Sequence, residues 1–516
     1  MLRRIVAASF VVAALAAGGT GTAQAQACGT TTTVGCLTAG NVMKAVQGAA
    51  TAISFDTMVI AVVDRAGTPL AVFRKAAAPA TVLGNFGAVV DANDQAVGLA
   101  RTGAFFSNDA APLSSRTVRF ISGIHFPPGV RNRPPGALYG IENTNRGCAL
   151  AAALDAVVPR ATSLTPGACT GGGAVAGCGT GIVTGKADVF DGSPSALDPG
   201  GVPIFKDGRV VGGIGVTGVP RAAAEFAAFR GSVAGGARFG PRVASPGAVF
   251  LDGIRLPFVN NTVRPAGVGP GVLAGAFVVA PIASPRVAVR KGYLLGPNAG
   301  VGLTVRNVKT IVNRAVAQAQ RTRAAIRLPL GSTTRMVIAV ADRTGTLLGV
   351  FRMNDATVFS IDVAATKARN AVYFSRTARN AGDMPGFPLG FSMTARTIGF
   401  GAMPLYPAGL DGTRSGPFFG DYRRDVLNPC TQGRDPANLG NQSGVVFFPG
   451  SVGIYRAGVL VGGLGVSGDG VEQDDLVTAA GVTPDFVAPP SIRADRVVIG
   501  GVRLPYFKFP RNPEVR

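Results

Sequence analysis

Apolar positions follow a helical period near the start of the chain and then change to strand-like runs. Within residues 38–54, apolar side chains recur every three or four positions, which predicts an amphipathic helix with Thr38 as its N-cap. Residues 58–63 and 70–73 are rich in β-branched side chains and flank the turn sequence at 64–67. This arrangement predicts a β-hairpin.

The next part of the pattern repeats the alternation of helix and hairpin. A second helix is expected over about 88–106, and a second hairpin from about 202 to 216, followed by a short helix. This order predicts an α+β fold, in which a roughly five-stranded antiparallel sheet is flanked by helices, rather than a doubly wound parallel sheet.

The whole pattern occurs twice. Residues 58–75 match residues 336–353 at most positions, and residues 210–218 recur as 460–468. These anchors predict two tandem domains of the same fold. We expect a first domain, a Pro/Gly/Ala-rich linker and a second domain over residues 37–258, 259–302 and 303–516. Each domain carries an insertion, near residues 130–200 and 376–450.

The N-terminus has the three parts of a secretory signal peptide. Arg3 and Arg4 precede an apolar run over residues 5–17, and a small-residue cleavage sequence follows, so residues 1–25 are the expected signal. Later apolar runs are too short to predict a membrane span. We therefore expect a periplasmic or secreted protein, with lipidation at Cys28 as the minor alternative.

Six cysteines in an exported chain allow up to three disulfides, and the sequence leaves their pairing open. Cys28 with Cys36, and Cys169 with Cys178, are close enough to form local links. The absence of any Cys-x-x-Cys spacing argues against thioredoxin-like redox chemistry and covalent c-type haem attachment. The net charge of +22 favours acidic partners, but the arginines are spread along the chain, which argues against nucleic-acid binding.

The repeated motifs resemble the GlcG/HbpS family, also called haem-degrading or DUF336 domains. The second copy carries the resemblance best, in the segments 342–345, 351–353, 367–369 and 468–475. The first copy departs from it: Lys75 replaces Met353, and the stretch Glu-Gln-Asp-Asp becomes Ala222–Phe226. The resemblance implies haem or tetrapyrrole binding in some members and assembly through contacts between domains.

Four arginines are candidates for binding such a ligand. Arg74 and Arg352 close the second strand of each first hairpin, and a guanidinium group suits a carboxylate such as a haem propionate. A structural ion pair explains these two equally well. Arg101 and Arg369 lie in the following helix, and we expect Arg352 and Arg369 to border an apolar pocket with the strand 463–467.

Glycine-rich strands close each copy. Gly463, Gly465 and Ser467 belong to a sequence that satisfies G-x-G-x-x-G, but it lies outside a first βαβ unit, so a dinucleotide site is not expected. Close packing of a strand against a helix is the favoured interpretation, and a backbone pocket for an anionic group is the alternative. Asp64 and Asp342 are explained by turn formation.

His125 is the only histidine, so any site that needs two is excluded. It is our candidate metal ligand, because histidine is the commonest protein ligand of haem iron. Met353 and Tyr406 are weaker alternatives in the second copy. No constellation of acid, base and nucleophile repeats in both copies, so the chain offers no candidate catalytic residues.

The leading hypothesis is an exported protein that binds haem or a similar tetrapyrrole, in which the two copies pack as an intramolecular pseudo-dimer. Its small-molecule ligand would be the main partner, with homo-oligomers also possible. The alternatives are a structural or interaction protein of the cell envelope, with the insertions as working surfaces, and a haem-degrading enzyme.

Overall fold

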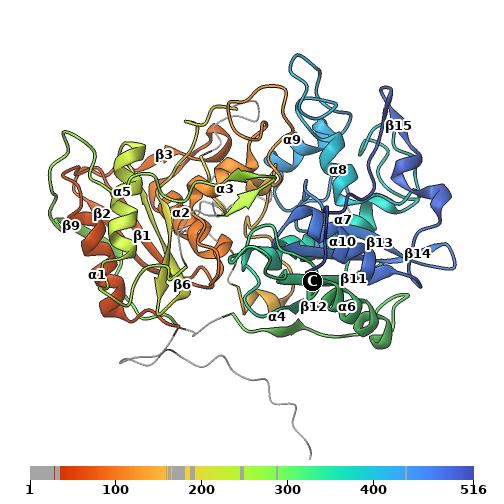
Figure 1. Ribbon diagram of the computed structural model, residues 1–516, viewed down its shortest axis with the longest axis horizontal. Helices are drawn as coiled ribbons and strands as arrows, with labels where there is room; N and C mark the ends of the chain where they lie inside the picture. Colours follow the sequence, from red (N-terminus) through yellow and green to blue (C-terminus); the bar gives the residue numbers. More distant parts are fainter. Residues whose placement is uncertain are drawn as a thin grey trace, which may run out of the picture.

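The computed structural model describes residues 28, 35–158, 160, 164, 181–185, 192–243, 249–285, 289–435 and 439–515 (Figure 1). The signal peptide expected at residues 1–25 and the pair Cys169 and Cys178 lie outside the described residues. No helix in the described part combines the length and apolar character needed to cross a bilayer.

The first repeat folds around a five-stranded antiparallel sheet in the order β5-β6-β1-β2-β9. Its strands are β1 (Val59–Asp64), β2 (Pro69–Lys75), β5 (Gly201–Lys206), β6 (Arg209–Thr217) and β9 (Gly275–Val279). The two predicted hairpins are β1 with β2 and β5 with β6, and β6 pairs with β1 at the centre. The sheet therefore joins the beginning of the repeat to its end.

The second repeat contains the same sheet, in the order β10-β12-β11-β14-β13. Its strands are β10 (Gly292–Leu295), β11 (Met336–Asp342), β12 (Leu347–Arg352), β13 (Ser451–Arg456) and β14 (Val459–Gly468). Val59 faces Arg74 in the first repeat, and Val337 faces Arg352 in the second. The matching register confirms the α+β fold class expected from the duplicated sequence.

The segment 259–302, expected as a linker, also contributes to both sheets. β9 pairs with β2 as an edge strand of the first sheet, and β10 pairs with β12 as an edge strand of the second. Both edge strands are short and begin with a glycine, so their sequence resembles a connector. Backbone pairing with an existing hairpin makes them strands.

Three long helices pack on each sheet. In the first repeat, α1 (Ala39–Ala50) and α5 (Arg221–Ser232) cover one face and α2 (Ala92–Phe106) covers the other. In the second, α6 (Val305–Ala319) and α10 (Val471–Val482) cover one face and α7 (Phe359–Ser375) the other. Thr38 caps α1 as predicted: its hydroxyl accepts the backbone N–H of Asn41 at 3.2 Å, and Thr304 caps α6 in the same way.

Shorter elements belong mainly to the insertions and the ends of the repeats. The additional α-helices are α3 (Ser115–Ser122), α4 (Ala152–Asp155), α8 (Ala395–Gly401) and α9 (Phe419–Leu427). The 3₁₀ turns are η1 (Asn85–Gly87), η2 (Ile141–Asn143), η3 (Leu439–Asn441), η4 (Pro490–Ile492) and η5 (Ala494–Arg496). Three small hairpins pair β3 (Thr81–Leu83) with β4 (Val89–Asp91), β7 (Phe250–Leu251) with β8 (Ile254–Arg255), and β15 (Val498–Ile499) with β16 (Val502–Arg503).

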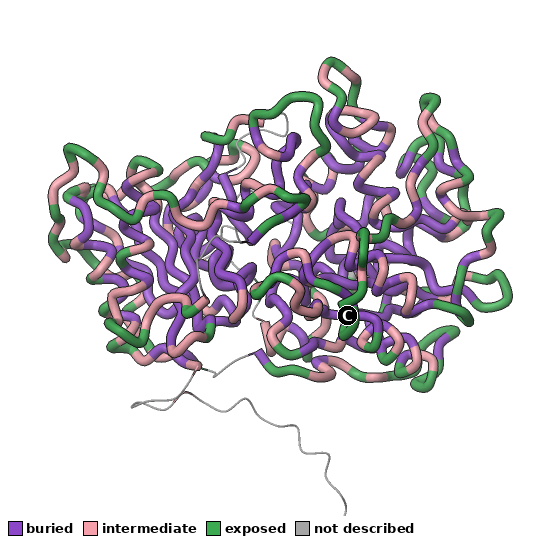
Figure 2. The backbone as a smooth tube through the Cα atoms, in the orientation of Figure 1, coloured by how far each residue is buried: buried purple, intermediate pink, exposed green. Residues whose placement is uncertain are grey.

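Buried side chains form three apolar clusters, and the buried backbone runs through the middle of both halves (Figure 2). One cluster fills the space between the first sheet and its helices α1 and α5, and another lies between the second sheet and its helices α6 and α10. The third contains residues of α2, α7 and both sheets. The rings of Phe106 and Phe359 stack within it, with centroids 4.2 Å apart. The two repeats therefore share part of their core.

Candidate functional site

The predicted ligand-binding arginines of the two helices both hold the turn of a hairpin. Arg101 Nε donates to the carbonyl oxygen of Gly67 at 2.9 Å, and Arg369 Nε donates to that of Gly345 at 3.2 Å. Arg369 also donates to the carbonyl oxygens of Ala149 and Leu150 in the first insertion. Burial lowers the pKa of both guanidinium groups to about 10. The same bond in both repeats gives these arginines a structural role.

The two arginines at the ends of the hairpins are also bonded to backbone carbonyls. Arg74 Nη2 donates to the carbonyl oxygen of Ala78 at 2.9 Å, and Arg352 Nη2 donates to that of Ala356. Arg352 is buried, and the desolvation of its guanidinium, with a smaller contribution from Arg65, lowers its pKa to about 9. Both arginines therefore hold the backbone four residues later in the chain. This role differs from the two that the sequence suggested, which were a ligand contact and an ion pair.

The glycines of β14 allow the strand to approach helix α7. A Cβ atom at Gly463 would lie 2.1 Å from the carbonyl oxygen of Ala368, and one at Gly465 would lie 2.1 Å from that of Ala364. The strand therefore packs directly against the helix, as the favoured interpretation expects, and leaves no room for a side chain at either position. Ser467 lies in the same packed region, where its hydroxyl bonds that of Ser360 at 3.0 Å.

The three predicted iron ligands are occupied by other contacts. His125 Nδ1 lies 3.1 Å from the carbonyl oxygen of Arg133, and its Nε2 lies 2.9 Å from Asp411 Oδ1. The buried sulfur of Met353 accepts the backbone N–H of Met336 at 3.4 Å, and the Tyr406 hydroxyl donates to the carbonyl oxygen of Ile499 at 3.1 Å. Within the described residues, no three His, Cys, Asp or Glu side chains gather as a metal site.

A buried ion pair distinguishes the second repeat from the first. Lys367 Nζ lies 3.0 Å from Asp474 Oδ2 and donates to the carbonyl oxygen of Val466 at 2.8 Å. The ammonium group also lies 4.8 Å from the ring centroid of Phe448. Burial raises the pKa of Asp474 to about 7, against the opposing effect of Lys367. The corresponding residues of the first repeat are Leu99 and Ala224, which carry no charge.

A second buried pair occurs in both repeats. Arg116 Nε lies 2.6 Å from Glu225 Oε1, and Arg396 Nε lies 2.5 Å from Asp475 Oδ2. Each pair joins a short helix, α3 or α8, to the last helix of its repeat. Glu225 shows that the first copy keeps one acid of the Glu-Gln-Asp-Asp stretch.

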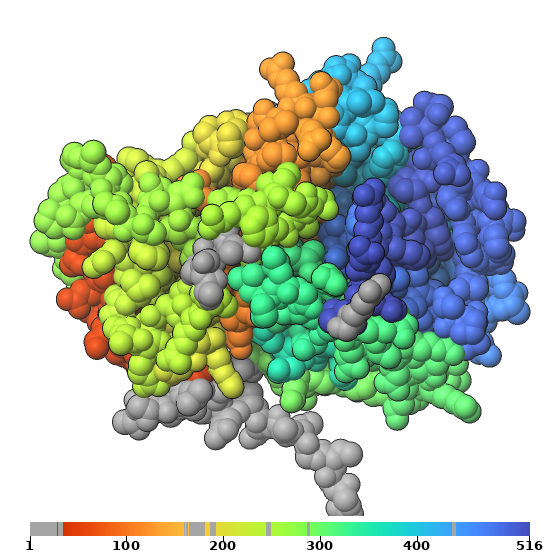
Figure 3. All heavy atoms as spheres, viewed as in Figure 1, coloured from red at the N-terminus to blue at the C-terminus, as the bar shows by residue number. Residues whose placement is uncertain are grey.

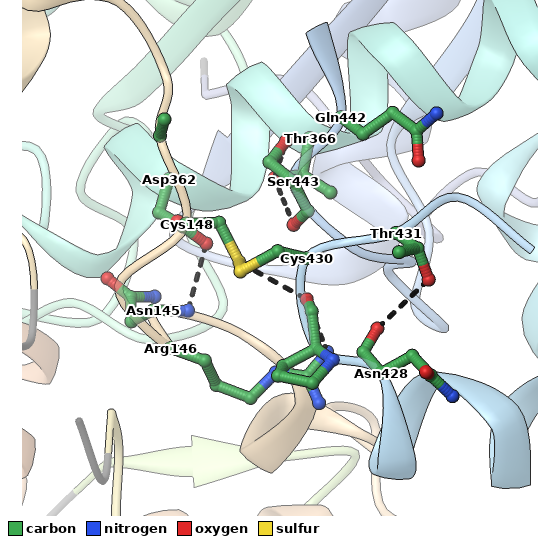
Figure 4. The surroundings of a disulfide bond; sticks show 12 residues. Asn145, Arg146, Cys148, Asp362, Thr366, Asn428, Cys430, Thr431, Gln442 and Ser443 are labelled. Carbon is green, nitrogen blue, oxygen red and sulfur yellow. Dashed lines mark hydrogen bonds between the residues drawn. A yellow bond between two sulfur atoms is a disulfide. The ribbon is translucent and has the colours of Figure 1, made fainter. Parts of the chain in front are cut away.

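The insertions bind to each other across the two repeats (Figure 4). A disulfide joins Cys148 of the first insertion to Cys430 of the second. Beside it, Arg146 Nη2 lies 2.6 Å from Asp425 Oδ2. The insertions are therefore clamped together by a disulfide and an ion pair.

A second disulfide joins Cys28 to Cys36, which is one of the two local links that the sequence spacing allowed.

The second repeat has an open groove that the sequence interpretation did not identify. Its volume is about 870 Å³, and it lies between α6 and the turn that joins β13 to β14. Arg314 Nη2 lies 2.6 Å from Asp485 Oδ2, whereas Arg306 and Arg456 form no ion pair with any described residue. The lining residues are Gly302, Arg306, Asn307, Thr310, Arg314, Arg456, Ala457, Val461, Asp485 and Phe486.

The first repeat has a groove of similar size at a different place. It measures about 820 Å³ and lies at the ends of α1 and α5. Arg230 and Arg264 contribute its positive charge, and Arg264 Nε is bonded to the carbonyl oxygen of Ala52 at 2.8 Å. This groove provides a matched comparison for the groove of the second repeat.

Comparison with known proteins gives a match within the second repeat. No curated protein matches the sequence. Similar solved structures include a PduOC–heme complex (24% identity, covering 37% of this chain and 100% of that chain, TM-score 0.23). Others are the Klebsiella pneumoniae DUF336 protein ORFY (19% identity, 35% and 88% coverage, TM-score 0.23) and a double mutant of Streptomyces reticuli HbpS (19% identity, 36% and 87% coverage, TM-score 0.21). The model of the family described as haem degrading protein HbpS-like matches residues 303–483. Residues 303–483, within the second repeat, therefore match the HbpS-like family.

Proposed function

We propose that this protein binds haem, or a tetrapyrrole with similar carboxylates, in the groove beside α6. The observation that carries the proposal is the placement of three arginines around one groove inside the repeat that matches the HbpS-like family. A groove of about 870 Å³ lies within the range of roughly 300–1,000 Å³ typical of small-molecule sites.

The groove residues fit the carboxylate end of such a ligand. Arg306 and Arg456 are exposed and have no acidic partner among the described residues, so their guanidinium forks are available for propionate groups. Val461, which is partly exposed, supplies apolar surface beside these arginines. When bound, haem would supply its iron chemistry, and these residues would hold and orient it.

The fit does not extend to the iron. The groove lining contains no His, Met, Cys or Tyr side chain, and His125, Met353 and Tyr406 are bonded elsewhere. We therefore propose recognition through the propionates, without an axial ligand from this groove. Because the only acid of the groove, Asp485, is paired with Arg314, we favour binding over turnover.

Ligand binding by Arg74, Arg101, Arg352 and Arg369 stays a prediction that the contacts of these side chains do not favour. Their donors are directed at backbone carbonyls. Binding at these positions would require the hairpin contacts to open.

Export and the pseudo-dimer complete the proposal. The signal-like sequence at residues 1–25 and two disulfides support an oxidising compartment such as the periplasm. The shared core and the Cys148–Cys430 link support two copies that act as one unit. Fusion raises the effective concentration of that contact.

The test is a titration of the chain from residue 26 with haem and with iron-free protoporphyrin, followed by absorbance. We expect saturable binding of both, because no axial ligand is involved. Arg306→Gln with Arg456→Gln should weaken binding by roughly tenfold or more, since a hydrogen bond to a charged group contributes about 1.5–3 kcal/mol.

The matched control is Arg230→Gln with Arg264→Gln, which removes the same charge from the groove of the first repeat and should leave the affinity unchanged. His125→Ala and Met353→Ala should also bind normally. Absence of binding by the unmodified chain would contradict the proposed function, whereas loss in either single variant would restore that residue as an axial ligand.

A further inference from the structure

The insertions end in two loops that meet on one edge of the molecule. We call residues 130–134 and 410–415 the insertion tips. The backbone N–H of Asn132 donates to Asp411 Oδ2 at 2.9 Å, and the backbone N–H of Asp411 donates to Asn132 Oδ1 at 3.0 Å. Figure 3 shows the neighbouring orange and cyan segments as adjoining projections at the upper edge. The tips therefore form one composite surface from both repeats.

Backbone hydrogen bonds hold the base of each tip. The N–H of Phe126 donates to the carbonyl oxygen of Pro134 at 2.7 Å, and the N–H of Tyr406 donates to that of Arg414 at 2.9 Å. The composite surface is thus presented by two closed loops.

The tips carry unbalanced positive charge. Arg131, Arg133 and Arg414 are exposed, and their guanidinium groups form no ion pair with any residue in the described parts of the chain. The acid of the tips, Asp411, is engaged by His125 at 2.9 Å and by Asn132. The carboxylate of Asp411 thus links the two tips and is not paired with any of the three tip arginines.

Apolar side chains stand beside these arginines. Val130 is 44% exposed and Leu410 is 47% exposed, one on each tip. Projecting loops cannot enclose a small anion. They can insert apolar side chains into a broad, negatively charged partner while their arginines contact its anionic groups.

We propose that the insertion tips dock on an anionic lipid surface. The charge of the tips is complementary to lipid phosphates, and Val130 and Leu410 are positioned to enter the interfacial layer. This role uses the insertions and is independent of the groove beside α6. It also brings both repeats to the membrane in one orientation, because each repeat contributes one tip.

The experiment is sedimentation of the chain from residue 26 with phosphatidylglycerol/phosphatidylcholine vesicles and with pure phosphatidylcholine vesicles. We expect binding to the anionic vesicles that weakens as salt is added. Each tip arginine should contribute about fivefold to the partition coefficient. Arg131→Gln, Arg133→Gln and Arg414→Gln together should therefore lower it by about a hundredfold, and Val130→Ser with Leu410→Ser should lower it further.

A control variant with Lys309→Gln, Arg323→Gln and Arg343→Gln removes three exposed cations from outside the tips. It should bind anionic vesicles nearly as well as the unmodified chain. An equal loss in this control, equal binding to pure phosphatidylcholine, or no binding to anionic vesicles at low salt would overturn the proposal. Thermal unfolding of each variant verifies that the fold is retained.

Discussion

The two repeats share the bonds that shape their hairpins and differ in what lies beneath the sheet. Arg101 and Arg369 hold equivalent turns. The buried ion pair of Lys367 with Asp474 occurs in the second repeat, whereas the aligned residues of the first repeat, Leu99 and Ala224, are uncharged. A contact present in both repeats belongs to the fold that they share. A feature confined to the family-matched repeat is therefore the better place to look for specialisation.

The largest effect should come from breaking the buried pair of the second repeat. Asp474→Ala leaves the Lys367 ammonium without its carboxylate and should lower the free energy of unfolding by about 3–5 kcal/mol. The double variant Lys367→Leu with Asp474→Ala copies the first repeat and should recover most of that loss. Urea unfolding measures both. If the double variant is as unstable as the single one, the uncharged residues of the first repeat cannot replace the ion pair in the second.

The next effect concerns the clamp between the repeats. Replacing Cys148 and Cys430 by serine removes a link across 282 residues and should lower the free energy of unfolding by about 2–4 kcal/mol. Replacing Cys28 and Cys36, which are eight residues apart, should have a smaller effect because the closed loop is short. A larger loss from the short link would show that the repeats remain joined without the clamp.

The smallest of these effects is a pH dependence at the contact between the repeats. Asp362 Oδ1 accepts the backbone N–H of Asn145 at 2.9 Å, and burial raises the pKa of Asp362 to about 6. The folded protein then holds this proton more tightly than the unfolded chain, so its contribution to stability is complete below about pH 4 and is lost as the pH rises to about 6.

Asp362→Asn should therefore reduce the loss of stability between pH 4 and pH 7 by about 2–3 kcal/mol. Urea unfolding at the two pH values measures the difference, and the exposed Asp252→Asn is the control. An unchanged pH dependence in Asp362→Asn would assign the titration to the other buried acids.

Local patterns in the sequence were enough to predict the hairpins, the capped first helix and the close packing of the glycine strands. The edge strands β9 and β10 were missed because their short runs become strands only when a hairpin lies beside them. The pairing of Cys148 with Cys430 depends on contacts between insertions, which spacing cannot reveal. His125 is a metal candidate by residue type alone, and the contacts of its two ring nitrogens with Arg133 and Asp411 depend on the fold.

The groove beside α6 left a detectable trace in the sequence. Arg306, Thr310 and Arg314 recur every four residues, which places them on one face of a helix. The contribution of Arg456 and Phe486 could not be anticipated, because they come from a turn and a loop more than 140 residues away.

The link between the insertions also sets an order of events during biosynthesis. Cys148 leaves the ribosome 282 residues before Cys430, and Cys169 and Cys178 are made in between. In an oxidising compartment, the cysteine closest to Cys148 in sequence, Cys169, would not be its final partner. The Cys148–Cys430 bond then requires that Cys148 stay reduced, or that an earlier disulfide be exchanged, until the second insertion has been made.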